Sequence, residues 1–245
     1  MKKIQFRAHR GVSAYAPENT MPAFEEAVAQ KIEFIETDPQ FTKDGVIVLM
    51  HDSTINRTCR NADGTEIQMP LRVCDLTYKE LLQYDAGIRK GEQFRGTKIP
   101  TLEELLAFAE GKDVIIELDK KIPTKDMDAL LDIVEKYDTQ VAFFCADVER
   151  IQKVQSRFQD ARIVYEGLTR EEDLQAVTSL VKSENLIIWV YLDKPNFSSW
   201  LEPLRLTSPE TCARVKKYGR LGIGNINHTF DVREALQYDP DVIEL

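Results

Sequence analysis

Two hydrophobic patterns alternate along the chain, short apolar runs and longer segments with helical spacing. The apolar runs are typical of buried strands, and eight of them lie at residues 4–8, 34–38, 114–119, 141–145, 162–166, 186–192, 221–226 and 241–245. Helical patterns lie between them, at residues 19–30, 102–110, 125–137, 147–158, 170–183, 209–218 and 230–237. Because neighbouring parallel strands need such crossovers, the order predicts an α/β fold, a TIM (β/α)8 barrel.

A ninth apolar run, residues 46–51, follows the second predicted strand after only a short turn that contains Lys43, Asp44 and Gly45. A parallel neighbour would need a longer crossover, so we expect this run to fold back as a hairpin and to leave the barrel count at eight. The segment from about 52 to 100 contains glycines and prolines but weak periodicity. We expect it to be an insertion after strand 2 that walls the active site.

The composition is that of an ordinary globular protein, with 245 residues of which 30% are charged and 43% hydrophobic. A barrel of this length is commonly one domain, so we expect a single domain over residues 1–245. The formal net charge of -9 argues against a nucleic-acid partner, which would need clustered Lys and Arg. The four cysteines form no C-x-x-C pair, and neither a leader nor a long apolar run is found, which predicts a cytoplasmic protein with no stable membrane insertion. The oligomeric state stays open.

Carboxylates end two neighbouring predicted strands. Glu36 and Asp38 are two residues apart, so the period of a strand points both side chains to one face, which in a barrel is the interior near the rim. Glu117 ends the next barrel strand and can supply a third oxygen ligand from the same rim. Clustered carboxylates suit a hard divalent cation, so the pattern predicts a site for Mg²⁺ or Ca²⁺. The alternative is that all three residues lie on the surface.

Two histidines are expected near these carboxylates. His9 stands at the end of the first strand, before Arg10 and Gly11, and His51 stands on the hairpin that leaves the second strand. Phosphodiester cleavage can use such a pair, with one histidine taking a proton from the attacking oxygen and the other giving one to the leaving alkoxide. A hydrogen-bonded histidine at a strand end is the simpler interpretation of His9 taken alone.

Eight short motifs follow one another through the first half of the chain: AHRG (8–11), PENT (17–20), ETD (36–38), TKDG (42–45), HD (51–52), NRT (56–58), DAG (85–87) and KIPTLEEL (98–105). In order and spacing they resemble the glycerophosphodiester phosphodiesterase family. The resemblance implies a TIM barrel with an insertion, and hydrolysis of glycerophosphodiesters to glycerol 3-phosphate and an alcohol.

The resemblance also assigns roles to residues at matching positions. It implies acid/base catalysis by His9 and His51 and phosphate binding by Arg10. It implies metal ligation by the three carboxylates already singled out, Glu36, Asp38 and Glu117. Gly11 would let the backbone turn closely beside the ligand, and residues 17–20 would cap the following helix and help to fix the mouth of the site.

The third strand departs from the family pattern. The family has Glu-x-Lys there, with the lysine facing phosphate, whereas this chain has Asp119 in the lysine position after Glu117. If the strand continues, Lys121 keeps the same phase two residues further on, which makes it the candidate for substrate binding. Asp119 would then pair with Lys121 or join the metal ligands. The alternative is that Lys120 and Lys121 are solvated loop residues.

The family tryptophan near the seventh strand is also missing, and the last strand ends at Glu244-Leu245 without the family's Thr-Asp. Trp189, Tyr191 and Trp200 either replace the lost aromatic wall or belong to the core. These departures leave the alcohol side of the substrate open.

Two other functions stay open. A lyase of the same barrel type, similar to phosphatidylinositol-specific or sphingomyelinase-D-like enzymes, would stop at a cyclic phosphate, and product analysis would separate it from a hydrolase. A non-catalytic phosphoester-binding protein is compatible with the loss of the family lysine and tryptophan, although both histidines and all three carboxylates are retained. A nuclease is disfavoured by the acidic balance.

Overall fold

The parallel strands follow the order of a closed (β/α)8 barrel. The computed structural model describes residues 3–194 and 202–245. In barrel order its strands are β1 (Gln5–Ala8), β10 (Val242–Glu244), β9 (Arg220–Gly224), β8 (Leu186–Tyr191), β7 (Arg162–Tyr165), β6 (Gln140–Cys145), β5 (Ile115–Leu118) and β2 (Phe34–Thr37). The predicted barrel of eight parallel strands is therefore confirmed. The chain divides into two compact units, one of residues 1–7 and 141–245 and one of residues 8–140.

The unit of residues 8–140 contains the parallel pair β2 and β5, in which Glu36 stands opposite Glu117. It also contains a hairpin of β3 (Pro39–Phe41) and β4 (Ile47–Leu49), which pair antiparallel. The predicted hairpin is thus confirmed, with β3 as the partner of the apolar run. Its turn is closed by the Thr42 hydroxyl, which donates to Asp44, and by Gly45, whose φ of 81° favours glycine.

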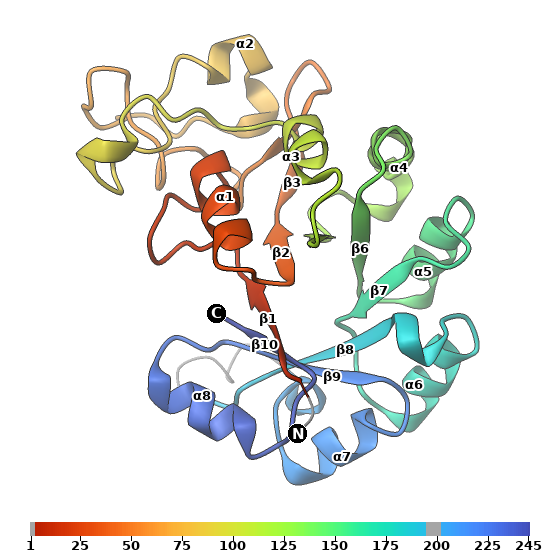
Figure 1. Cartoon of the computed structure of the whole chain (residues 1–245). Helices are drawn as coiled ribbons and strands as arrows, with labels where there is room; N and C mark the ends of the chain where they lie inside the picture. The colour runs from red at the N-terminus through yellow and green to blue at the C-terminus, as the bar shows by residue number, and fades with distance from the viewer. Residues whose placement is uncertain (1–2, 195–201) are drawn as a thin grey trace. The chain divides into compact units, whose positions relative to one another are not determined.

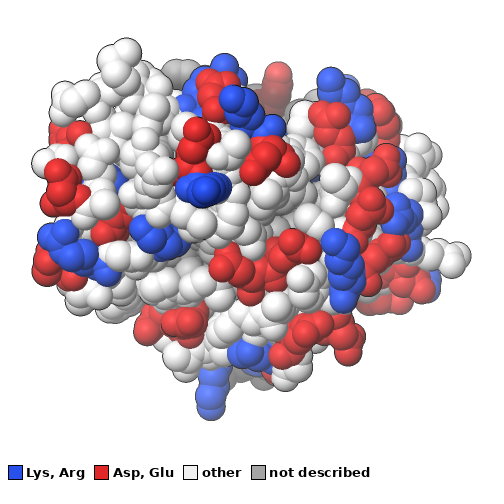
Figure 2. Space-filling view, turned by 90° about the horizontal axis from the view of Figure 1, so that it is seen from above, with Lys and Arg blue, Asp and Glu red and all other residues white. Residues whose placement is uncertain are grey.

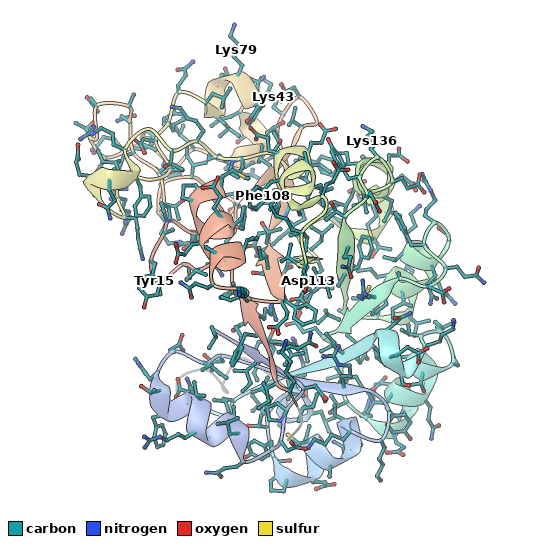
Figure 3. All side chains as sticks on the ribbon, viewed as in Figure 1. Tyr15, Lys43, Lys79, Phe108, Asp113 and Lys136 are labelled. Atoms are coloured by element: carbon teal, nitrogen blue, oxygen red, sulfur yellow. The ribbon has the colours of Figure 1, made fainter. Side chains whose placement is uncertain are left out.

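Four α-helices belong to the same unit: α1 (Met21–Ala29), α2 (Tyr78–Leu81), α3 (Leu102–Ala109) and α4 (Asp128–Val134). Reciprocal hydrogen bonds start two of them, between Thr77 and Glu80 at α2 and between Thr101 and Glu104 at α3, so their first turns have satisfied backbone donors. Figure 3 shows Lys79 projecting from α2 away from the ribbon. Short 3-10 helices lie in the same unit at Val73–Asp75, Glu92–Phe94 and Thr124–Asp126, and in the other unit at Ser183–Asn185 and Pro203–Arg205.

The segment between β4 and α3 is mostly irregular, as its weak periodicity predicts (Figure 1). Its apolar side chains nevertheless form one cluster of buried residues, Val48, Met50, Ile55, Cys59, Val73, Leu81, Ala86 and Ile99. The cluster fixes a segment that has little secondary structure of its own. That this segment is an insertion, and that the whole chain is a single domain, stay predictions.

The other unit contains β1 and the strands from β6 to β10, with α5 (Val148–Gln155), α6 (Glu171–Thr178), α7 (Pro209–Val215) and α8 (Thr229–Leu236). Helices α6, α7 and α8 lie along one side of β8 and β9 (Figure 1). Trp189 on β8 is fully buried, and the Arg7 guanidinium lies 4.2 Å from the centre of its ring. Trp189 therefore belongs to the core. Trp200 lies outside the described residues.

No helix in the described ranges is long and apolar enough to cross a membrane. The four cysteines are free thiols. On the face seen in Figure 2, basic and acidic side chains are interspersed, which is unlike the basic stripe of a nucleic-acid-binding surface. The cytoplasmic location stays a prediction.

Candidate active site

The loop after β1 carries the His-Arg-Gly motif in an unusual backbone conformation. Arg10 has a φ of 59° and Gly11 a φ of 76°, so the chain turns through the left-handed region directly after the strand. A Cβ atom on Gly11 would lie 2.7 Å from the Cβ of Ala23 on α1. Glycine is therefore required here by the close approach to α1, and the expected approach of this backbone to a ligand stays a prediction.

The PENT motif lies behind the same loop. Asn19 is buried, and its Nδ2 donates to Oδ2 of Asp38 over 2.8 Å. Its Oδ1 accepts from the Thr37 hydroxyl over 2.7 Å. Thr20 occupies the N-cap position of α1, but its hydroxyl donates to the carbonyl oxygen of Pro17 over 2.6 Å. Asn19 thus holds Asp38, and the helix begins at the predicted N-cap, Thr20, without a side-chain hydrogen bond to its first turn.

Three carboxylates come together beside this loop. One oxygen each of Glu36, Asp38 and Asp119 lies within 4.8 Å of the other two, an arrangement able to hold a metal ion. Glu36 and Asp38 are each 1% exposed, and Asp119 is half-buried. Glu117, the third ligand expected from the sequence, is fully buried on β5 opposite Glu36. The third carboxylate of the cluster is instead that of Asp119, which directly follows β5.

Cationic and histidine side chains surround the three carboxylates. The Arg10 backbone N–H donates to Oε2 of Glu36 over 2.9 Å, and Nε2 of His9 lies 3.9 Å from the same oxygen. The two oxygens of Asp38 face different cations, Nε of Arg10 at 3.5 Å and Nζ of Lys121 at 3.7 Å. The structure therefore brings together five of the seven residues predicted for the site, and Asp119 lies in the carboxylate cluster, which is one of its two expected places.

His51 follows the β3–β4 hairpin and is oriented by its neighbour in the chain. Its Nδ1 lies 2.7 Å from Oδ1 of Asp52. Gln40 on β3 donates to the carbonyl oxygens of His51 and Asp52, at 3.2 and 2.9 Å, which holds the backbone that carries the histidine. A hydrogen bond from Arg57 contributes most to lowering the pKa of Asp52 to about 2, so an ionised Asp52 accepts the proton on Nδ1 of His51.

Arg57 links the two histidine-bearing parts of the site, a role that the sequence did not assign. Its Nε donates to Asp52 over 2.6 Å, and its Nη1 donates to Glu18 over 2.8 Å. Glu18 in turn accepts from Nη1 of Arg10 over 3.0 Å. Burial raises the pKa of Glu18. The hydrogen bond from Arg57 and the charge of Arg10 act in the opposite direction and help to outweigh burial, so the pKa of Glu18 lies below its ordinary value. The only sequence signal for this contact was that Glu18 lies in the PENT motif and Arg57 in the NRT motif.

The donor set fits a hard divalent cation. Three carboxylates, Glu36, Asp38 and Asp119, bring their oxygens together, and the side chains of Arg10 and Lys121 approach Asp38. A dication would offset part of this concentrated negative charge. All these donors are oxygen atoms, the ligands that Mg²⁺ and Ca²⁺ prefer.

Comparison with known proteins agrees with this arrangement. The model of the glycerophosphoryl diester phosphodiesterase family matches residues 9–217, a range that includes every residue of the site. The chain belongs to this family. Family membership explains why the motifs of the first half and the barrel occur together.

Curated relatives match about half of the chain, at about 40% identity. A glycerophosphodiester phosphodiesterase of Caldanaerobacter subterraneus subsp. tengcongensis is 42% identical over 114 residues, covering 46% of this chain and 44% of the relative. Glycerophosphodiester phosphodiesterase 1 of Homo sapiens is 40% identical over 121 residues, covering 49% of this chain and 34% of the relative. The match thus spans less than half the length of these curated relatives.

Solved structures match over nearly the whole chain. A phosphodiesterase of Oleispira antarctica, in complex with the product sn-glycerol-3-phosphate, has a TM-score of 0.74 at 20% identity and covers 98% of this chain and 92% of its own. A glycerophosphodiester phosphodiesterase of Agrobacterium tumefaciens has a TM-score of 0.65 at 25% identity, covering 99% and 96%. At these identities the likeness supports the family fold.

Proposed function

We propose that the chain is a metal-dependent phosphodiesterase of the cytoplasm, which hydrolyses glycerophosphodiesters to glycerol 3-phosphate and an alcohol. The observation that carries the proposal is the meeting of the His9-Arg10 loop with the carboxylate cluster of Glu36, Asp38 and Asp119. The family match and the product complex of the Oleispira antarctica relative support the choice of substrate.

The metal, Mg²⁺ or Ca²⁺, is held by Glu36 and Asp38, by Glu117 as in the family, and by Asp119. When bound, such a cation polarises a phosphoryl oxygen and neutralises charge on the phosphate. Arg10 and Lys121 bind the phosphate from either side of Asp38, which both of them already approach. A guanidinium and an ammonium together meet the charge that develops on the phosphoryl oxygens.

His9 and His51 perform the proton transfers. Their side chains are 41% and 34% exposed, so a substrate can reach both rings. One histidine takes the proton of the attacking oxygen, and the other gives a proton to the leaving alkoxide. Because Asp52 accepts the Nδ1 proton of His51, the Nε2 atom of that ring is the one that exchanges a proton with the substrate.

The test is to incubate the protein with a glycerophosphodiester such as glycerophosphocholine and Mg²⁺ or Ca²⁺, and to detect glycerol 3-phosphate. His9→Ala and His51→Ala should each lower kcat about 10²–10⁴-fold while metal affinity, measured by calorimetry, stays at the parent value. A cyclic phosphate as the final product would replace the hydrolase with a lyase. No turnover of any glycerophosphodiester by the parent protein would overturn the proposal.

A further inference from the structure

A cavity of about 270 Å³ lies beside the candidate active site, within the unit of residues 8–140. Its lining includes Glu18 and Arg57, which the site already uses. Glu18 contacts Arg10 over 3.0 Å, and Arg57 contacts Asp52, the partner of His51, over 2.6 Å. Glu18 therefore links the cavity to the proposed phosphate-binding arginine, and Arg57 and Asp52 link it to His51.

The lining of this cavity is positive although the protein as a whole is acidic. Three basic side chains, Arg57, Arg89 and Lys90, face one acidic side chain, Glu18, which gives a formal charge of +2 in a chain whose net charge is -9. Arg57 is held between two carboxylates. Arg89 and Lys90 instead donate to backbone carbonyl oxygens, those of Arg57 and Ser13, which leaves the charge of both side chains available to a ligand.

The two basic residues stand on a segment that is fixed before any ligand arrives. Oδ1 of the buried Asp85 accepts from the backbone N–H groups of Gly87 and Ile88, at 2.8 and 2.9 Å, and its Oδ2 accepts from Gly96 at 2.7 Å. These bonds close the turn that carries Arg89 and Lys90. A pre-formed cationic site binds an anion without the cost of ordering a loop.

On the basis of the proposed function, we propose that the cavity receives the alcohol half of the glycerophosphodiester, and that Arg89 and Lys90 select an alcohol that carries a second negative group. A phosphate or a carboxylate on the alcohol fits this charge. The volume suits a small polyol or similar head group. A cationic alcohol such as choline would meet two like charges, which opposes its binding.

The test compares three diesters of glycerol 3-phosphate that differ only in the alcohol: inositol 4-phosphate, glycerol and choline. For the parent protein, kcat/KM should be highest for the phosphorylated alcohol and lowest for choline. The double variant Arg89→Gln/Lys90→Gln should lower the ratio of kcat/KM for the phosphorylated over the neutral alcohol by at least about ten-fold. The loss should lie mainly in KM, and the parent's preference should weaken with rising salt.

The matched control is Lys79→Gln, because Lys79 is an exposed lysine on α2 that projects away from the ribbon (Figure 3). This variant should keep the parent's order of substrates, and all three proteins should hydrolyse the neutral diester at similar rates. If the parent hydrolyses the neutral diester but shows no preference for the phosphorylated alcohol, or if the double variant keeps the preference, the inference fails and the proposed function stands. If no diester is hydrolysed, the proposed function itself fails.

Discussion

The Nδ2 atom of Asn19 donates a 2.8 Å hydrogen bond to Oδ2 of Asp38, and both side chains are buried. Asn19 reaches this position from the left-handed region, with a φ of 54°, which asparagine adopts more readily than most residues. The bond fixes one oxygen of Asp38 and so orients its carboxylate, which lies near the side chains of Arg10 and Lys121 and is a ligand of the proposed metal. Asn19 is therefore a positioning residue for the metal site.

Removing the Asn19 side chain should weaken metal binding. Asn19→Gly retains access to a positive φ but loses the bonds to Asp38 and Thr37, so we expect metal affinity and kcat/KM to fall by about 10–100-fold. The free energy of unfolding should fall by about 1–3 kcal/mol because buried partners are left unsatisfied. Titration calorimetry and chemical denaturation measure these effects. Lys31→Gly, at an exposed residue with a φ of 59°, is the control, and equal metal affinity in both variants would contradict the role given to Asn19.

Neutralising Asp119 should also weaken metal binding. Asp119→Asn removes the negative charge of one of the three carboxylates that the structure brings together, and we expect the metal dissociation constant to rise at least about ten-fold. Glu117→Gln should have a similar effect, since the family resemblance makes Glu117 a ligand. Asp113→Asn, before the start of β5 (Figure 3), should leave the affinity unchanged.

The comparison decides which carboxylate of β5 binds the ion. If Asp119→Asn binds metal like the parent while Glu117→Gln does not, Asp119 only balances the charge of nearby cations. Activity that survives complete chelation in the parent protein would exclude the metal site altogether.

Asp52 should contribute a stability that disappears in acid. Its pKa is lowered from 3.8 to about 2 in the folded protein, so its contribution is present above 3.8 and is lost as the pH falls towards 2. Asp52→Asn should therefore be less stable than the parent at neutral pH, and the difference should shrink between these two pH values. Urea denaturation across that range measures it. A difference that stays constant with pH would mean that the ionised carboxylate is not the stabilising group.

Local patterns account for most of the fold and for part of the site. Each predicted barrel strand overlaps an observed one, because apolar runs between helical segments can only be buried as parallel strands. The pairing of Glu36 with Asp38 followed from the period of two. The bonds of Asn19 to Asp38 and of Arg57 to Glu18 join residues 19 and 39 positions apart. No local periodicity encodes such contacts, so sequence reasoning treated these motifs as capping or left them without a role.

Gly11 should tolerate a side chain less well than Gly45 does. Both have a positive φ, 76° and 81°, so alanine costs backbone strain of about 1–2 kcal/mol at either position. Only at Gly11 would the new Cβ also meet Ala23, at 2.7 Å, whereas at Gly45 it meets no described heavy atom within 4 Å. Gly11→Ala should therefore lower the free energy of unfolding by about 1–3 kcal/mol more than Gly45→Ala. Equal losses would show that the loop moves away from α1 without cost.

Lys121 should bind the phosphate in place of the family lysine. The strand β5 ends at Leu118, so Lys121 reaches the site from the turn that follows it, and its Nζ lies 3.7 Å from Oδ1 of Asp38. The side chain is 29% exposed, so substrate can reach it. Lys121→Ala should lower kcat/KM at least about ten-fold, which corresponds to ~1.4 kcal/mol of lost transition-state stabilisation. Lys120→Ala should have little effect, because it is the Lys121 ammonium that lies beside Asp38.

A second measurement separates phosphate binding from simple pairing with Asp38. If Lys121 only neutralised that carboxylate, Lys121→Ala would leave Asp38 with less competition for the cation, so metal affinity would rise while the KM for substrate stayed constant. If Lys121 binds the phosphate, Lys121→Ala should instead lower kcat/KM even at saturating metal. Lys121→Arg should retain part of the parent's kcat/KM, because arginine keeps the positive charge. If Lys121→Ala and Lys120→Ala give the same kcat/KM, the phosphate is held without this lysine.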